Sequence, residues 1–194
     1  MKHFSELSPS AERVLDAAES LLQQRGYAGF SIDDVAVQVG IRKPSVHHHF
    51  ATKADLVATI VQRYAHRFEA ALAQVEAEHP AAPDRLAAYA GLFARTFADE
   101  RRLCVCGMLG AESDALPAEV VLGVERFFAA NLDWLARVIA HGQRAGLLRR
   151  KPSATELAAT YFGALEGAMV LGRGMQAAAG PKEVGHTLLS LVLA

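Results

Sequence analysis

Apolar residues recur every three or four positions along most of this chain, which is the spacing of one buried face of an α-helix. Leu56, Ile60 and Tyr64 belong to one such series, and Pro80 and Pro83 end it. Hydrophobic residues make up 52% of the 194 residues and aromatic residues only 7%, and alanine interleaved with leucine and valine favours helices over strands. No strand pattern competes, so the sequence predicts an all-α fold.

Two short helices joined by a glycine turn are predicted near the N-terminus. Ser31 stands three residues before Asp34, as in a capping box that begins a helix, and Gly40 ends that helix. Pro44 suits the first position of the next helix, so the pair forms a helix-turn-helix. The expected helices cover residues 11–25, 31–39, 44–50, 54–78, 85–98, 102–113, 117–145, 154–176 and 181–194.

The second of these short helices carries a polar face that suits DNA. We expect Ile41, Val46 and Phe50 to pin the helix to its neighbours. A helix of this kind can lie in the major groove, where hydrogen-bond donors reach phosphates and guanine edges. The alternative is that this face is an ordinary solvated surface. The donors expected to face outward are Arg42, Lys43, Ser45, His47 and His48, and Lys53 extends the patch.

The overall charge gives no support for nucleic-acid binding. There are 20 Lys+Arg and 21 Asp+Glu residues, a net charge of -1 at pH 7. Between Arg42 and Lys53, however, the charged residues are Arg42, Lys43 and Lys53 alone. The case for DNA therefore depends on this local basic, histidine-rich edge.

The stretch from residue 13 to residue 56 carries a recognisable series of motifs. They are Arg25-Gly26-Tyr27, Ser31-Ile32-Asp33-Asp34-Val35-Ala36, Gly40-Ile41, Val46-His47-His48-His49-Phe50 and Lys53-Ala54-Asp55-Leu56. This stretch resembles the N-terminal domain of the TetR family of transcriptional regulators. The resemblance implies a three-helix DNA-binding domain over residues 1–53 and a helical effector-binding and dimerisation domain over residues 54–194.

The same resemblance assigns roles to single positions. Lys43, Pro44 and His47 match base-contacting positions, while Ser45, His49 and Lys53 match positions that commonly touch phosphate. Two residues depart from the family pattern: His47 stands where tyrosine is usual, and Arg42 where a small hydroxyl residue is common. The expected DNA-binding residues are Ser31, Arg42, Lys43, Pro44, Ser45, His47, His48, His49 and Lys53.

The cysteines Cys104 and Cys106 are a second distinctive feature. Together with Leu109 and Glu112, they resemble a subgroup of the family in which a cysteine opens the sixth helix, and some members of that subgroup respond to electrophiles or oxidants. A thiol near a helix N-terminus and beside Arg101 and Arg102 would ionise readily. The alternative is that both cysteines are buried packing residues.

The resemblance also implies a small-molecule effector and a homodimer. The candidate pocket or sensor residues are Cys104, Cys106, Met108, Phe127, Trp134 and Tyr161, although aromatic residues at helical spacing also occur as plain core. Gly163 and Gly167, four residues apart, would allow close helix packing between two copies. The expected protein is a repressor that releases its operator on binding an effector or on cysteine modification. An activator or ligand-independent regulator of the same fold is the alternative.

Several other functions have no support in the sequence. No paired carboxylates, nucleophile elbow or phosphate loop indicates an enzyme, and no cofactor is expected. Consecutive histidines such as His47, His48 and His49 point about 100° apart on a helix, so no metal site is expected. No apolar run reaches the roughly 18 to 20 residues of a membrane span, and Met1 to Ser10 lack the apolar stretch of a secretion signal. Two cysteines make no disulfide framework, and a cytoplasmic location follows as an expectation.

Overall fold

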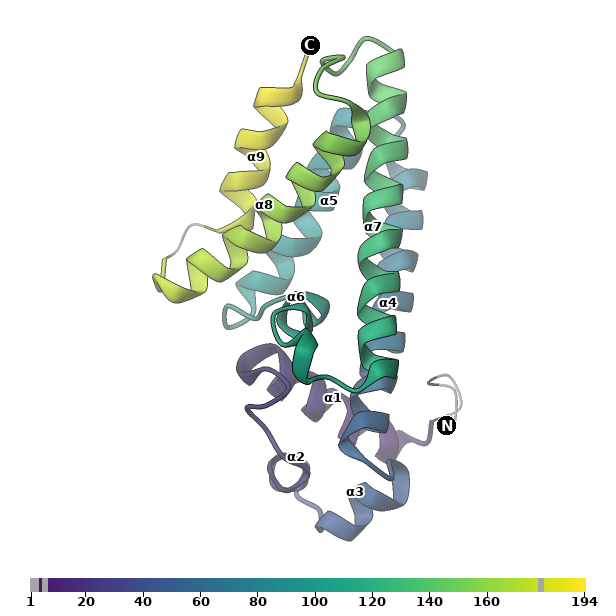
Figure 1. Cartoon of the computed structure of the whole chain (residues 1–194), viewed down its shortest axis with the longest axis vertical. Helices are drawn as coiled ribbons and strands as arrows, with labels where there is room; N and C mark the ends of the chain where they lie inside the picture. Colours follow the sequence, from purple (N-terminus) through teal and green to yellow (C-terminus); the bar gives the residue numbers. More distant parts are fainter. Residues whose placement is uncertain (1–3, 5–6, 178–179) are drawn as a thin grey trace. The chain divides into compact units, whose positions relative to one another are not determined.

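Helices form nearly all the regular structure of this protein, seen in a computed structural model that describes residue 4, residues 7–177 and residues 180–194 (Figure 1). Apart from one isolated bridge between Leu148 and Leu193, these residues form no β-structure, which confirms the all-α prediction. Five of the residues used to judge a secretion signal, at positions 1–3, 5 and 6, lie outside the described part. The elements are α1 (Pro9–Arg25), α2 (Ile32–Val39), α3 (Lys43–His49), α4 (Lys53–Glu78), α5 (Ala82–Ala98), α6 (Val105–Gly110), the short 3-10 helix η2 (Ser113–Ala115), α7 (Ala118–Arg144), α8 (Ala154–Gly174) and α9 (Pro181–Val192).

The signals expected to begin and end the N-terminal helices are confirmed. The Ser31 side chain accepts a hydrogen bond from the backbone N–H of Asp34, and the Asp34 carboxylate accepts one from the backbone N–H of Ser31. Gly40 follows α2 in the left-handed conformation, with φ 76° and ψ 35°. Pro44 lies in the first turn of α3, where its missing N–H costs no helical hydrogen bond.

The chain divides into two compact units. Unit 1 contains Met1–Phe68 and Val105–Phe127, and unit 2 contains Glu69–Cys104 and Phe128–Ala194. The expected boundary between a DNA-binding domain, residues 1–53, and an effector-binding domain, residues 54–194, stays a prediction. The compact units follow a different division because α6, η2 and the first turns of α7 join the N-terminal helices.

Unit 1 has an apolar core in which α3 is held by α1 and α2. Val14 and Leu15 of α1, Val35 of α2 and Val46 of α3 are completely buried. At about 25 cal/mol per Å², such burial is the main force that fixes short helices like α2 and α3, which would be marginal alone. An ion-pair network joins α4 to α1: Arg63 lies 2.7 Å from both Asp16 and Glu19, and Arg67 also pairs with Glu19.

Unit 2 is a bundle in which α5 contacts both α8 and α9 (Figure 1). Close approach of α9 to α5 depends on Gly185, because a Cβ added there would lie 2.5 Å from the Cβ of Ala90. The core of the bundle is mostly aliphatic but includes an aromatic group made of Tyr89, Phe93, Trp134 and Tyr161.

The helix expected over residues 102–113 is shorter in the structure. Glu100 and Arg101 have positive φ values of 53° and 54°, so the chain turns sharply there and helix α6 begins only at Val105. Cys104 therefore directly precedes α6. Residues 102–104, which were expected to be helical, form a non-helical segment between this turn and α6 instead.

Candidate nucleic-acid interface and sensor site

The polar face of α3 is exposed as expected. Val46 and Phe50 are buried on one side of this helix, with Val46 completely so, and they fix its orientation against α1 and α2. The opposite side offers donors, with little apolar surface between them. The exposed residues on this side are Arg42, Lys43, Pro44, Ser45, His47 and His48.

One of the two exposed cations on this face is partly neutralised. Lys43 Nζ lies 2.7 Å from the Asp33 carboxylate of α2. Both side chains are at least half exposed, so this ion pair is weak and can be exchanged for a phosphate. The guanidinium group of Arg42 has no hydrogen-bond or ion-pair partner in the described part of the chain. Its five donors are available to a ligand.

The histidines of α3 differ in their contacts. His47 Nδ1 lies 3.1 Å from the carbonyl oxygen of Ala51, which makes Nδ1 the donor in that hydrogen bond. Nε2 of the neutral ring is then an acceptor, and it becomes a donor only in the imidazolium form. His49 is half-buried, with Nε2 3.1 Å from the Ser10 hydroxyl of α1.

Lys53, expected to touch phosphate, is turned toward the protein. Its ammonium donates to the carbonyl oxygens of Tyr27, at 2.5 Å, and of Phe30, and it lies 4.5 and 4.2 Å from the centroids of their rings. Burial lowers the pKa of Lys53, and the carboxylates of Glu112 and Asp34 oppose that effect. These contacts hold the turn between α1 and α2 against the start of α4.

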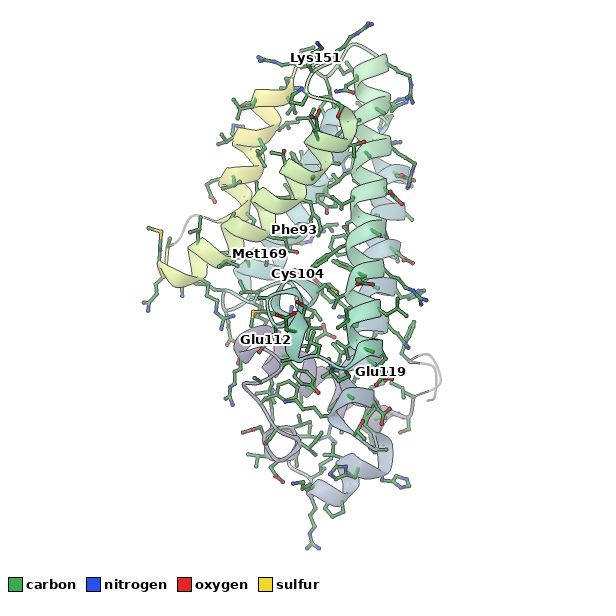
Figure 2. The ribbon with its side chains drawn as sticks, in the orientation of Figure 1. Phe93, Cys104, Glu112, Glu119, Lys151 and Met169 are labelled. Carbon is green, nitrogen blue, oxygen red and sulfur yellow. The ribbon has the colours of Figure 1, made fainter. Side chains whose placement is uncertain are left out.

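Glu112 holds the same turn from the other side. Its carboxylate accepts hydrogen bonds from the backbone N–H groups of Tyr27, at 2.5 Å, and Ala28, at 3.1 Å. Gly26 is required here twice over, since its φ is 76° and a Cβ would lie 2.8 Å from Glu112 Oε2. Glu112, which is labelled in Figure 2, thus ties the helix-turn-helix to the segment 105–127 of the same unit.

Ser31 has a structural partner. Its hydroxyl lies 2.6 Å from Asp34 Oδ2 within the capping box, and these hydrogen bonds lower the pKa of Asp34. The side chain is exposed, so the position still lies on the surface of unit 1.

The expected sensor residues fall into both compact units. Cys106, Met108 and Phe127 belong to unit 1, where Phe127 packs 5.5 Å from the ring of Tyr64. Cys104, Trp134 and Tyr161 belong to unit 2. Only this second group shares a compact unit with the bundle core.

An aromatic cluster in unit 2 contains Trp134 and Tyr161. Tyr89 stacks on Trp134, with ring centroids 5.5 Å apart and planes at 17°, and lies 6.3 Å from Tyr161. The hydroxyl of Tyr89 donates to Asn131 Oδ1 at 2.8 Å, and that of Tyr161 donates to the carbonyl oxygen of Leu86 at 3.0 Å. The Trp134 indole N–H is buried and finds no acceptor among the described residues.

Cys104 lies beside a carboxyl group in unit 2. It is only 1% exposed, and its thiol hydrogen-bonds to Glu166 of α8. The neighbouring guanidinium groups are engaged elsewhere, Arg102 with Asp99 at 2.9 Å and Arg101 with the carbonyl oxygen of Gln176. Because the Cys104 thiol is enclosed and hydrogen-bonded, this environment favours a packing role over a reactive one.

Two acidic residues at these sites had no predicted role. Glu112 was noted only as part of a motif, and Glu166 follows Phe162 by one helical turn in an apolar helix. Glu166 could have been singled out from the sequence because it is an acidic residue among the apolar residues of this helix. No comparable signal existed for Glu112, because its partners are 84 and 85 positions away.

The described residues offer neither a metal site nor a membrane-spanning helix. No group of three or more His, Cys, Asp or Glu side chains within residues 4, 7–177 and 180–194 could hold a metal ion. Among the helices of the same residues, none has the length and apolar character needed to span a membrane.

Comparisons with known proteins agree with this geometry. Residues 14–60 match the family model described as bacterial regulatory proteins, tetR family. A TetR-family transcriptional regulator from Agrobacterium tumefaciens has a crystal structure that superposes with a TM-score of 0.90, at 33% identity, over 95% of this chain and 98% of that one. The HTH-type transcriptional regulator EthR of Mycobacterium tuberculosis is 29% identical over 148 residues, which are 75% of this chain and 67% of EthR.

Another relative matches over a shorter stretch of the chain. The HTH-type negative transcriptional regulator IcaR of the Staphylococcus aureus biofilm operon icaADBC is 36% identical over 45 residues, which are 23% of this chain and 24% of IcaR. The chain therefore belongs to the TetR family of transcriptional regulators, and it is a regulator rather than an enzyme.

Proposed function

We propose that this protein is a homodimeric repressor that binds operator DNA through α3 and releases it when a small molecule binds in unit 2. The exposed donor face of α3, fixed from behind by Val46 and Phe50, carries the proposal. The description of IcaR as a negative regulator supports repression.

The contacts on α3 suggest two groups among the expected DNA-binding residues. Arg42, Lys43, Pro44, Ser45, His47 and His48 are exposed and are the proposed DNA contacts. Ser31, His49 and Lys53 already hydrogen-bond within the protein, and we assign them the role of positioning α2, α3 and the turn before α2.

A direct test uses DNA from the promoter of the protein's own gene and of neighbouring genes. The proposal predicts one strongly preferred site, with an affinity that falls steeply as salt concentration rises. Equal weak binding to every fragment would argue against an operator. Preferred binding that increases gene expression in a reporter assay would instead identify an activator.

Replacing His47 tests its contact with DNA. Its Nδ1 is held by the carbonyl oxygen of Ala51, so Nε2 is the ring nitrogen available to a ligand. We expect His47→Ala to lower operator affinity by about 10-fold, or roughly 1 kcal/mol. Fluorescence anisotropy with labelled operator measures this change. Unchanged affinity in the variant would refute the contact.

The exposed faces of α8 and α9 support a homodimer. Val170, Leu171 and Leu191 are 59%, 65% and 61% exposed, although all three are large apolar residues. Gly163 and Gly167 lie on the same helix as Val170, and a Cβ at either would meet nothing within 4 Å of the protomer. Nothing in the protomer requires these glycines, whereas a second helix could approach closely over them.

Replacing Gly163 by leucine tests this interface. The substitution leaves the protomer unstrained and raises helix propensity, so we expect a folded protein whose dimer dissociates at least about 10-fold more readily. Sedimentation at micromolar concentration measures the mass. Ala77→Leu on the exposed side of α4 is the control and should remain dimeric. An unchanged dimer in Gly163→Leu would place the interface elsewhere.

The effector is proposed to bind reversibly in unit 2. The aromatic cluster there contains a buried indole N–H without an acceptor in the described residues, whereas Cys104 is enclosed and hydrogen-bonded. Segment 105–127 of unit 1 is covalently continuous with unit 2 at both ends, through Cys104 and Phe128. The same segment holds the helix-turn-helix through Glu112. A ligand-dependent change of conformation can therefore shift the population of DNA-binding states.

A further inference from the structure

The carboxyl group of Glu166 is an unusual feature of the core of unit 2. Its Oε1 atom is buried and has no hydrogen-bond partner among the described residues. The same carboxyl group does form a hydrogen bond with the thiol of Cys104. A buried carboxyl with an empty acceptor position is costly in a folded protein, and such groups mark functional sites more often than packing sites.

The groups around Glu166 explain why it lacks a partner. It interacts electrostatically with Tyr89, whose hydroxyl proton is already donated to Asn131 at 2.8 Å. The hydroxyl of Tyr89 is therefore not available to donate to Glu166.

Aromatic rings form part of the core in the same unit as Glu166. Phe162, one helical turn before Glu166, lies 6.0 Å from Phe93 and 5.6 Å from Phe128 between ring centroids. Tyr89 continues this cluster to Trp134, at 5.5 Å. Figure 2 shows Phe93, Cys104 and Met169 in the same region of the unit. Aromatic faces with a single carboxylate are the combination that binds organic ammonium groups, through ion pairing and cation–π attraction.

We propose that Glu166 and the aromatic cluster bind a protonated organic amine with an apolar or aromatic body. The ammonium group would donate to Glu166 Oε1 and lie against the aromatic rings. The Trp134 indole N–H, the second unsatisfied group, would donate to a hydrogen-bond acceptor on the same ligand. This inference rests on the proposed effector site and specifies the chemical class of its ligand.

The ionisation of Glu166 agrees with this role. Burial raises the pKa of Glu166 to about 7, against 4.5 for an ordinary glutamate, and the hydrogen bond from Cys104 limits the rise. Near neutral pH the carboxyl loses its proton easily when a cation arrives, and the resulting ion pair is neutral overall. A carboxylate ligand would instead place two like charges together.

The single tryptophan of the chain provides a direct assay. Trp134 belongs to the cluster, so its fluorescence, excited at 295 nm, reports on binding there without interference from another tryptophan. Three probes share a phenylalkyl body of similar length and differ in a polar end group that is positive, neutral or negative: 4-phenylbutylamine, 4-phenylbutanol and 4-phenylbutyrate. We expect the amine to bind at least about 10-fold more tightly than the alcohol, and the carboxylate more weakly than both.

The variant Glu166→Gln separates charge recognition from simple apolar binding. It should lower the affinity for the amine to that for the alcohol and leave the alcohol within about twofold of the original protein. Glu69→Gln, an exposed change on α4, is the matched control and should alter neither affinity. Equal binding of the three probes, unchanged emission with every probe, or full selectivity in Glu166→Gln would each overturn the proposal. Operator binding is measured separately without probes, so failure of the amine site leaves the repressor proposal to be judged on its own assay.

Discussion

Replacing Lys53 by methionine is expected to destabilise the helix-turn-helix by about 2 to 3 kcal/mol. Methionine keeps an apolar stem but cannot donate a hydrogen bond, so the carbonyl oxygens of Tyr27 and Phe30 lose their shared cationic donor. The rings of the same two residues lose a cation–π partner. Denaturant unfolding of unit 1, followed by circular dichroism at fixed protein concentration, measures the loss.

DNA binding by the same variant distinguishes a positioning role from a phosphate contact. A lysine that binds phosphate contributes about 1 to the slope of log affinity against log salt concentration. We expect Lys53→Met to lower operator affinity while leaving that slope unchanged. Lys151→Met, a change of an exposed lysine, is the control for loss of charge. A smaller slope together with unaltered stability would instead identify Lys53 as a phosphate ligand.

Replacing Glu166 by glutamine is expected to stabilise unit 2 in a pH-dependent way. Because the pKa of Glu166 is about 7 in the folded state and 4.5 is the ordinary value, the unfolded chain releases this proton first as the pH rises. The stability contributed by the protonated carboxyl is complete below about pH 4.5 and is lost as the pH rises through 7. The full difference is about 3 kcal/mol at pH 8.

The titratable groups that interact with Glu166 are Cys104 and Tyr89. Thermal and denaturant unfolding between pH 5 and 8 should show the free energy of unfolding of Glu166→Gln exceeding that of the original protein by an amount that grows with pH. Glu69→Gln on exposed α4 should show no such trend. A constant difference between the two proteins across this range would show that burial does not perturb Glu166.

Much of the fold could be predicted from the sequence because its signals are local. The Ser31–Asp34 capping box and the glycine at position 40 involve residues within a few positions of each other, and both were confirmed. The apolar stripe of α4 likewise predicted its end at Glu78. The exposed face of α3 followed from the burial of Val46 and Phe50 alone.

The features of the fold and of the site that could not be predicted from the sequence depend on contacts between residues far apart in the chain. Lys53 looked like one more member of a basic patch, but its ammonium is held by carbonyl groups 23 and 26 positions earlier. The start of α6 was placed too early because the positive φ of Glu100 and Arg101 has no local sequence signature. The pairing of Cys104 with Glu166, 62 positions later, could not be inferred from a motif centred on the cysteine.

The central claim is that the exposed face of α3 reads an operator, and Arg42 tests it most directly. Its side chain has no partner in the described part of the protein, and it is the N-cap of α3, at the end where a helix in the major groove approaches DNA most closely. The measurement is fluorescence anisotropy with the preferred promoter site, comparing Arg42→Ala with Arg150→Ala, which removes an equal charge from an exposed position in unit 2. We predict that Arg42→Ala lowers operator affinity by about 10- to 100-fold, or roughly 1 to 3 kcal/mol, with unchanged protein stability, while Arg150→Ala has almost no effect. Equal affinities for both variants and the original protein would contradict the assignment of α3 as the DNA-reading helix.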